Sequence, residues 1–198
     1  MSKTLILIDA GFLSKLSKHF GGGYYLKYDI IKLSENLARK ENLECSVIYY
    51  YTSPPFQSEF SSKEEMERKE KYDKFIKKLS FNKKIAVREG RCQRLKIDGK
   101  FIYKQKAVDT LMIMDLMRIP LEHKEIKKII LIASDSDFVP IVEYLQKIGL
   151  EIILYTHYTK KRSTNFSRSN ALLQTVTRYS ELSKQDFLNS LLNEENKK

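Results

Sequence analysis

The sequence contains few cysteines and no long apolar run. Among its 198 residues, only Cys45 and Cys92 are cysteines, too few for a disulfide framework or a zinc site. No stretch approaches the run of about 18 apolar residues that a membrane-spanning helix needs. The sequence also shows no basic leader followed by an apolar segment and a small-residue cleavage site. We therefore expect a cytoplasmic protein that has no membrane partner.

Internal repeats and low-complexity linkers are also absent from the sequence, which favours a single folded unit. A chain of 198 residues is long enough for one domain with a sizeable core and short for two. We expect one domain over residues 1–180, followed over residues 181–198 by a C-terminal helix and a frayed tail. The sequence leaves open whether the chain forms a homodimer.

Positive charge is in excess. Lysine and arginine together number 36, aspartate and glutamate together number 25, and the formal net charge is +11. This balance indicates a polyanionic partner, with nucleic acid as the leading candidate. Lysine-rich surfaces also serve solubility, so the charge alone does not decide between the two.

The stretch from Lys128 to Leu145 carries the strongest functional signal. Its apolar run Ile129–Ala133 is typical of a strand buried on both faces, and an apolar helix face follows that run. Asp135 and Asp137 lie at the turn between the two elements. One acid would suffice as a helix N-cap, whereas two adjacent acids repel each other unless a cation or a shared proton intervenes. This segment alone leaves both a cap and a metal site open.

Two further acids occupy comparable positions. The apolar run Leu5–Ile8 ends on Asp9, which in a parallel sheet would emerge at the same edge as the Asp135 pair. The alternative for Asp9 is an Asx turn. Asp109 lies in the first turn of a predicted helix and could reach the same site. Asp115 lies about 9 Å further along that helix, at 1.5 Å per residue, and we interpret it as structural or as a residue that supports a metal ligand.

The densest basic surface is predicted around Asp98-Gly99, a strong signal for a two-residue hairpin turn. In the first strand, basic residues alternate with Leu95 and Ile97, so we expect one basic and one apolar face. A second basic segment, residues 156–170, also contains hydroxyl groups and aromatic rings. Both segments could bind nucleic acid, although lysines also protect edge strands and the second segment could be a solvated loop. The candidate nucleic-acid-binding residues are Arg91, Arg94, Lys96, Lys104, Lys160, Lys161, Arg162 and Arg168.

Three segments carry a family resemblance when they are taken in order: LILIDAGFL, KAVDTLMIMDLM and IILIASDSDFVPIVEYLQKIGLEIILY. In this order and spacing they resemble the NYN domain family, a branch of the PIN-like metal-dependent ribonucleases. The resemblance covers roughly residues 4–156. It implies an α/β fold of three layers, with a central, mostly parallel sheet and helices on both faces. The basic β-hairpin would be an insertion into this fold.

The resemblance also implies an acidic pocket that holds Mg²⁺ or Mn²⁺ and acts on RNA. Carried over by position, the metal ligands and catalytic residues are Asp9, Asp109, Asp135 and Asp137. Ser134 and Ser136 would contribute hydroxyl groups, and Lys106 would lie beside the pocket. The ion would activate a water for attack on a phosphodiester of single-stranded or structured RNA, leaving a 5′-phosphate.

The chain departs from the family pattern at two positions. It has Phe12 where members often have Asn, and Ser134 where they often have Gly. Two other functions therefore stay open: a non-catalytic RNA-binding or regulatory module, and a haloacid-dehalogenase-type phosphatase using Asp135-Ser136-Asp137. The phosphatase is the weaker alternative because its motif normally stands early in a chain, whereas only 61 residues (198 minus 137) follow Asp137 here.

Overall fold

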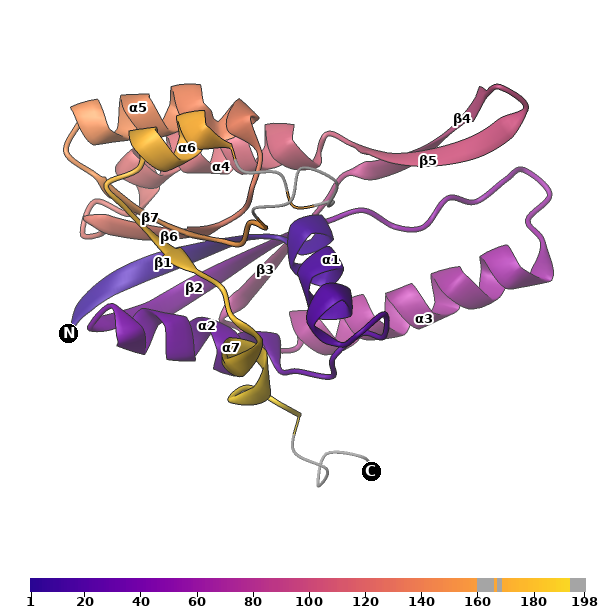
Figure 1. Cartoon of the computed structure of the whole chain (residues 1–198), viewed down its shortest axis with the longest axis horizontal. Helices are drawn as coiled ribbons and strands as arrows, with labels where there is room; N and C mark the ends of the chain where they lie inside the picture. Colours follow the sequence, from indigo (N-terminus) through magenta and orange to yellow (C-terminus); the bar gives the residue numbers. More distant parts are fainter. Residues whose placement is uncertain (160–165, 167–168, 193–198) are drawn as a thin grey trace.

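A six-stranded sheet forms the centre of the computed structural model, which describes residues 1–159, 166 and 169–192 (Figure 1). All its strands pair in parallel, in the order β3-β2-β1-β6-β7-β8. The strand bounds are β1 Ser2–Asp9, β2 Leu43–Thr52, β3 Ile85–Glu89, β6 Lys128–Ile132, β7 Glu151–Thr156 and β8 Arg178–Glu181. The strand order reverses between β1 and β6. In open parallel sheets, ligands bind outside the carboxyl ends of the strands at such a reversal.

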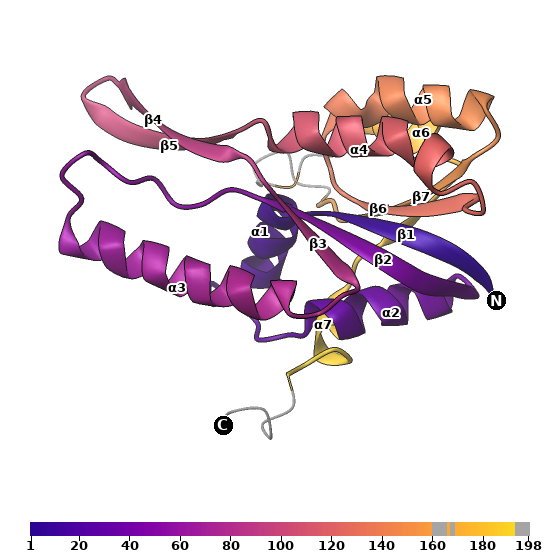
Figure 2. The same ribbon diagram turned by 180° about the vertical axis from the view of Figure 1, so that it is seen from behind.

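Helices cover both faces of the sheet and complete three layers (Figures 1 and 2). One face carries α4 (Val108–Glu122), α5 (Val139–Lys147) and α6 (Asn170–Thr175). The other carries α1 (Ala10–Phe20), α2 (Ile30–Lys40), α3 (Lys63–Ser80) and α7 (Lys184–Leu188). The three-layer α/β fold that the sequence predicts is confirmed.

The central strands are apolar because both of their faces are covered. Leu5 and Leu7 of β1 pack into the core beneath α4 and α5, whereas Ile6 and Ile8 pack into the core beneath α1 and α2. All four side chains are fully buried. Each contributes about 1.5–3 kcal/mol relative to an exposed position. These two cores fix where β1 ends, and therefore where Asp9 emerges.

Side-chain caps fix the starts of two helices. Asp29 Oδ1 accepts the backbone N–H groups of Ile31 and Lys32, over 2.8 and 3.1 Å, at the start of α2. Ser62 and Glu65 form a capping box at the start of α3. These residue types are favoured at helix starts because their side chains satisfy the unpaired N–H groups of a first turn.

A separate two-stranded sheet consists of β4 (Arg91–Ile97) and β5 (Lys100–Lys106), joined by the Asp98-Gly99 turn. Both turn residues have positive φ, 49° and 76°, as such a hairpin turn requires. The register pairs Arg94 with Tyr103 and Lys96 with Phe101, so these four side chains share one face. The predicted division into a basic and an apolar face is therefore wrong. Alternation within one strand does not fix what the partner strand adds to each face.

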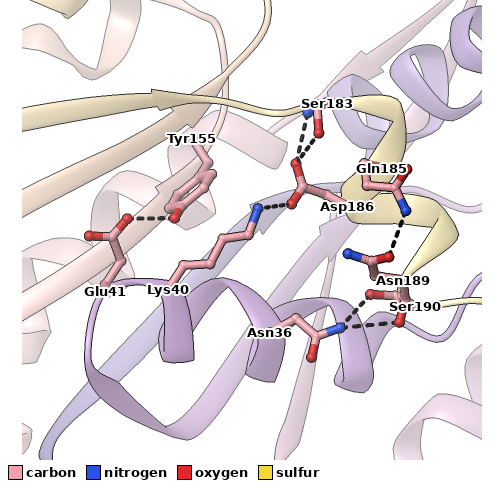
Figure 3. A network of polar contacts seen from close by, with 9 residues as sticks. All are labelled: Asn36, Lys40, Glu41, Tyr155, Ser183, Gln185, Asp186, Asn189 and Ser190. Atoms are coloured by element: carbon pink, nitrogen blue, oxygen red, sulfur yellow. Dashed lines mark hydrogen bonds and ion pairs between the residues drawn. The ribbon is translucent and has the colours of Figure 1, made fainter.

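The C-terminal segment is tied to the rest of the fold through α7. Phe187 is fully buried in the core beneath α1 and α2. The buried Asp186 forms an ion pair with Lys40 and accepts hydrogen bonds from the backbone N–H and hydroxyl of Ser183, over 2.9 and 2.7 Å (Figure 3). Asn36 Nδ2 donates to Ser190 Oγ over 2.9 Å. These contacts join α7 to α2.

The sequence does not predict α6 or β8. Both are short, with six and four residues, and precede α7 in the chain. In the part of the chain that the structure describes, no helix has the length and apolar character needed to cross a membrane.

Candidate active site

Three carboxylates from separate elements line one cleft at the carboxyl edge of the sheet. Asp9 ends β1, Asp135 follows β6, and Asp109 lies in the first turn of α4. The cleft has a volume of about 470 Å³. Its lining residues are Asp9, Gly11, Phe12, Lys15, Tyr103, Lys104, Gln105, Val108, Asp109, Ser134, Asp135 and Phe166. The strand reversal between β1 and β6 thus coincides with an acidic cleft.

Asp9 is held in place by the start of α1. Its Oδ1 accepts the backbone N–H groups of Gly11 and Phe12, over 2.8 and 3.1 Å. The pKa of Asp9 is nevertheless raised, chiefly by burial; the two hydrogen bonds and the nearby Lys15 oppose this shift, and the charge of Asp135 adds to it. Asp9 can therefore have both roles at once: one of its oxygens caps α1, and its carboxylate also lines the acidic cleft.

The charges of the other acids act on Asp109. Its pKa is raised first by burial and then by the negative charges of Asp9, Asp135 and Asp137. Like charges disfavour ionisation when they share a poorly solvated site. The four predicted acids therefore lie close enough to interact, although they come from three distant parts of the sequence.

Within the Asp135-Ser136-Asp137 segment, only Asp135 lines the cleft. Asp135 Oδ1 accepts the backbone N–H of Asp137 over 3.0 Å, which caps the short 3₁₀ helix η1 (Ser136–Phe138). Ser134 lines the cleft beside Asp135. Ser136 and Asp137 are exposed and are not among the described residues that line it. Lys106, at the end of β5, is likewise exposed and outside the lining.

The cleft offers donors that suit Mg²⁺ or Mn²⁺. Within residues 1–159, 166 and 169–192, no three His, Cys, Asp or Glu side chains are gathered closely enough to form a complete metal site. Mg²⁺ does not require such a cage, because it usually binds through one or two carboxylates, several waters and substrate phosphate. The hard oxygen donors of Asp9, Asp109 and Asp135, facing one cleft, meet that requirement.

The sequence does not predict several of the residues that line the cleft. Lys15 lies one helical turn after Gly11, on the same side of α1, and its charge lowers the pKa of Asp9. The four-residue spacing from Gly11 is the signal that could have identified it. Tyr103 and Gln105 reach the cleft from β5. Nothing in the local sequence pattern places them there, because the hairpin packs beside α1 only in the folded protein.

Asp115 belongs to a different network, which joins α4 to β2 and β3. Its Oδ2 accepts hydrogen bonds from the Tyr51 hydroxyl over 3.0 Å and from Arg88 Nε over 2.9 Å. The Asp115 side chain is 12% exposed and does not line the acidic cleft. The structure thus supports its predicted structural role.

The candidate nucleic-acid-binding residues are divided between two regions. Arg91, Arg94, Lys96 and Lys104 are exposed on the hairpin, and Lys104 also lines the acidic cleft. The Arg94 guanidinium lies between two aromatic rings, 4.6 Å from the centroid of Phe56 and 4.5 Å from that of Phe101. Lys160, Lys161, Arg162 and Arg168 lie outside the described residues.

Comparisons with known proteins agree with this arrangement. Residues 3–177 match the NYN domain. The chain belongs to the NYN domain family. NYN domains are PIN-like and are commonly nucleases. No curated protein shows significant similarity to the sequence.

A solved structure shares the fold of this NYN domain. It is the crystal structure of a protein of unknown function from Vibrio parahaemolyticus, which superposes with a TM-score of 0.54. The two sequences are 15% identical, and the match covers 94% of this chain and 95% of the other. At this identity the likeness shows the fold alone.

Proposed function

We propose that this NYN domain is a cytoplasmic ribonuclease that hydrolyses RNA phosphodiester bonds with Mg²⁺ or Mn²⁺. One observation carries the proposal. Asp9, Asp109 and Asp135 line a single cleft at the strand reversal, and burial together with repulsion from the neighbouring acids raises the pKa of Asp109. Structural caps alone would not require three acids in one cleft. A divalent cation would relieve this repulsion and bring a phosphate to the same place.

The acids and the lysines of the cleft would have different roles in the reaction. One or two of the carboxylates of Asp9, Asp109 and Asp135, together with waters and substrate phosphate, would hold a divalent ion, which would stabilise charge at the phosphate and lower the pKa of water. Asp9 is fixed by two backbone hydrogen bonds, so its carboxylate keeps its position without reorganisation. Lys15 and Lys104 lie along the same cleft and would offset the repulsion between RNA phosphates and the acids. No serine or cysteine nucleophile is needed.

Cleavage of labelled single-stranded and hairpin RNAs with Mn²⁺ or Mg²⁺ tests the proposal. We expect the wild type to cut and EDTA to abolish cutting. Asp135→Asn should lower the rate at least about 100-fold, a loss comparable to that caused by removing one group that stabilises a transition state. Asp73→Asn is the matched control, because it removes one carboxylate from the exposed Asp73–Lys69 pair on α3. Cutting that survives Asp135→Asn would contradict the proposal.

A non-catalytic RNA-binding module is the second candidate. The observation in its favour is that Asp137, one of the four predicted ligands, is exposed beside the cleft instead of lining it. This function predicts that RNA is retained without being cut in either metal, and that Asp135→Asn leaves affinity in EDTA unchanged or raises it.

A further inference from the structure

A second cleft lies next to the acidic one. It has a volume of about 680 Å³ and is bounded by α1, the end of β2, the following loop, α3 and the base of the β4-β5 hairpin. Its lining includes one positively charged residue, Arg68, and five aromatic residues, Tyr25, Tyr50, Tyr72, Phe75 and Tyr103.

Three of the five aromatic rings that line this cleft are exposed. Tyr25 is 63% exposed, Tyr103 is 48% exposed and Phe75 is 41% exposed. Tyr50 is buried and supports Phe75 through an edge-on contact, with 6.1 Å between ring centroids. Large aromatic surface left in contact with water beside a concave site is typical of a binding surface.

The two clefts adjoin each other. Gly11, Tyr103 and Gln105 line both of them, so these three residues form a seam between the acids and the aromatic rings. An RNA strand with one phosphate among the acids would therefore reach Tyr103 and then the second cleft while staying on the protein surface.

Charge on both sides of the seam suits a polyanion. Arg68 is exposed and lines the aromatic cleft. Lys18 Nζ lies 5.7 Å from the centroid of the Tyr25 ring. Lys15 and Lys104 line the acidic side. An uncharged apolar ligand or a proline-rich peptide would leave these cations unused, whereas RNA uses the rings for its bases and the cations for its phosphates.

We propose that the second cleft binds an unpaired base of the RNA strand, next to the phosphate held in the acidic cleft. This inference rests on the proposed function and narrows its substrate to single-stranded RNA. In a duplex, each base face is already stacked on its neighbours. An exposed aromatic ring can stack only on a base that the strand leaves free.

Binding in EDTA tests the proposal without cleavage. The probe is a fluorescently labelled single-stranded RNA of about 12 nucleotides, within the usual site sizes for such strands, and the readout is polarisation. We expect Tyr25→Ala to weaken binding about tenfold and Tyr25→Phe, which keeps the ring, to leave it near the wild-type value. Tyr144→Ala is the matched control, because Tyr144 is 49% exposed on α5, which covers the other face of the sheet. We expect it to have no effect.

A second probe separates stacking from charge. In an RNA of the same length without bases, Tyr25→Ala should change affinity no more than Tyr144→Ala does. If Tyr25→Ala lost the same affinity for the RNA without bases as for the normal RNA, the proposal would be overturned. It would also be overturned if a blunt duplex bound as tightly as the single strand and Tyr25→Ala weakened both equally. Wild type that binds through Tyr25 but cuts nothing in Mn²⁺ would overturn the proposed function alone. Cutting by the wild type, with unchanged binding by Tyr25→Ala, would overturn only the aromatic subsite.

Discussion

Gln105 of β5 lies directly over Gly11 in the first turn of α1, so closely that a Cβ added to Gly11 would be 3.0 Å from its Oε1. The same Cβ would be 3.2 Å from Oδ1 of Asp9, which accepts the Gly11 backbone N–H over 2.8 Å. Gly11 thus brings the hairpin against the acidic end of β1. This close contact defines the seam between the two clefts.

Gly11→Ala should separate stability from function. Alanine is favoured over glycine within helices by about 1 kcal/mol, and the exposed Gln105 side chain can move aside. The methyl group must also displace the Asp9 carboxylate, which two backbone hydrogen bonds hold, so we expect an unfolding free energy near that of the wild type. The methyl group would narrow the passage beside Asp9 and lower kcat/KM several-fold. Thermal melting and RNA cleavage measured together check this. A stable variant with full activity would show that substrate does not pass over the seam.

Divalent cations should stabilise the wild type more than Asp135→Asn. A ligand that binds only the folded state adds about 2.7 kcal/mol at 100 times its Kd. For a chain of this size, that corresponds to a rise in Tm of roughly 5–10 °C. Melting curves with and without Mn²⁺ measure the shift, and Asp73→Asn should behave as the wild type. Equal shifts in wild type and Asp135→Asn would argue against coordination by Asp135.

The raised pKa of Asp109 predicts how metal-free stability depends on pH. A carboxyl group whose pKa is higher in the folded state loses its stabilising contribution as pH rises through that folded value, because ionisation is harder in the cleft than in the unfolded chain. Asp109→Asn cannot ionise and avoids this loss. In EDTA near pH 7.5 we expect the variant to melt a few degrees above the wild type.

That difference between Asp109→Asn and wild type should vanish as the pH approaches the ordinary aspartate value of 3.8. Added Mg²⁺ should reverse the order, because only the wild type keeps all three carboxylates of the cleft. Melting temperatures measured across pH check both statements. A difference between the two proteins that does not vary with pH would mean that neither burial nor the neighbouring charges raise the pKa of Asp109.

The hairpin cations should contribute to RNA affinity through phosphate contacts. Arg94→Ala combined with Lys96→Ala removes two exposed charges, so affinity should fall and the slope of log K against log salt should flatten by about 1.4 for a single strand. The control pair, Lys124→Ala with Lys127→Ala, removes the same charge before β6, at the opposite edge of the sheet. Unchanged affinity and slope in the hairpin variant would leave these residues only the role of protecting an edge strand.

The sequence by itself determines the elements and the acids at their ends. Apolar runs such as Leu5–Ile8 predict buried strands because both faces of a parallel sheet are covered, and Asp29 predicts a helix start because its side chain satisfies the N–H groups of the first turn. Asp9 and Asp135 follow apolar runs, and parallel pairing brings them to one edge. These inferences depend on local pattern and on the one direction that parallel strands share.

Only the tertiary structure decides how distant segments meet. The register across the Asp98-Gly99 turn puts Tyr103 beside Arg94 and replaces the expected basic face with a mixed one. The approach of Gln105 to Gly11, the arrival of Lys15 in the acidic cleft and the exposure of Asp137 beside it depend on how the hairpin, α1 and η1 pack. Side-chain contacts between segments 90 or more residues apart leave no periodic signal in the sequence, because each segment keeps the same local pattern wherever it docks.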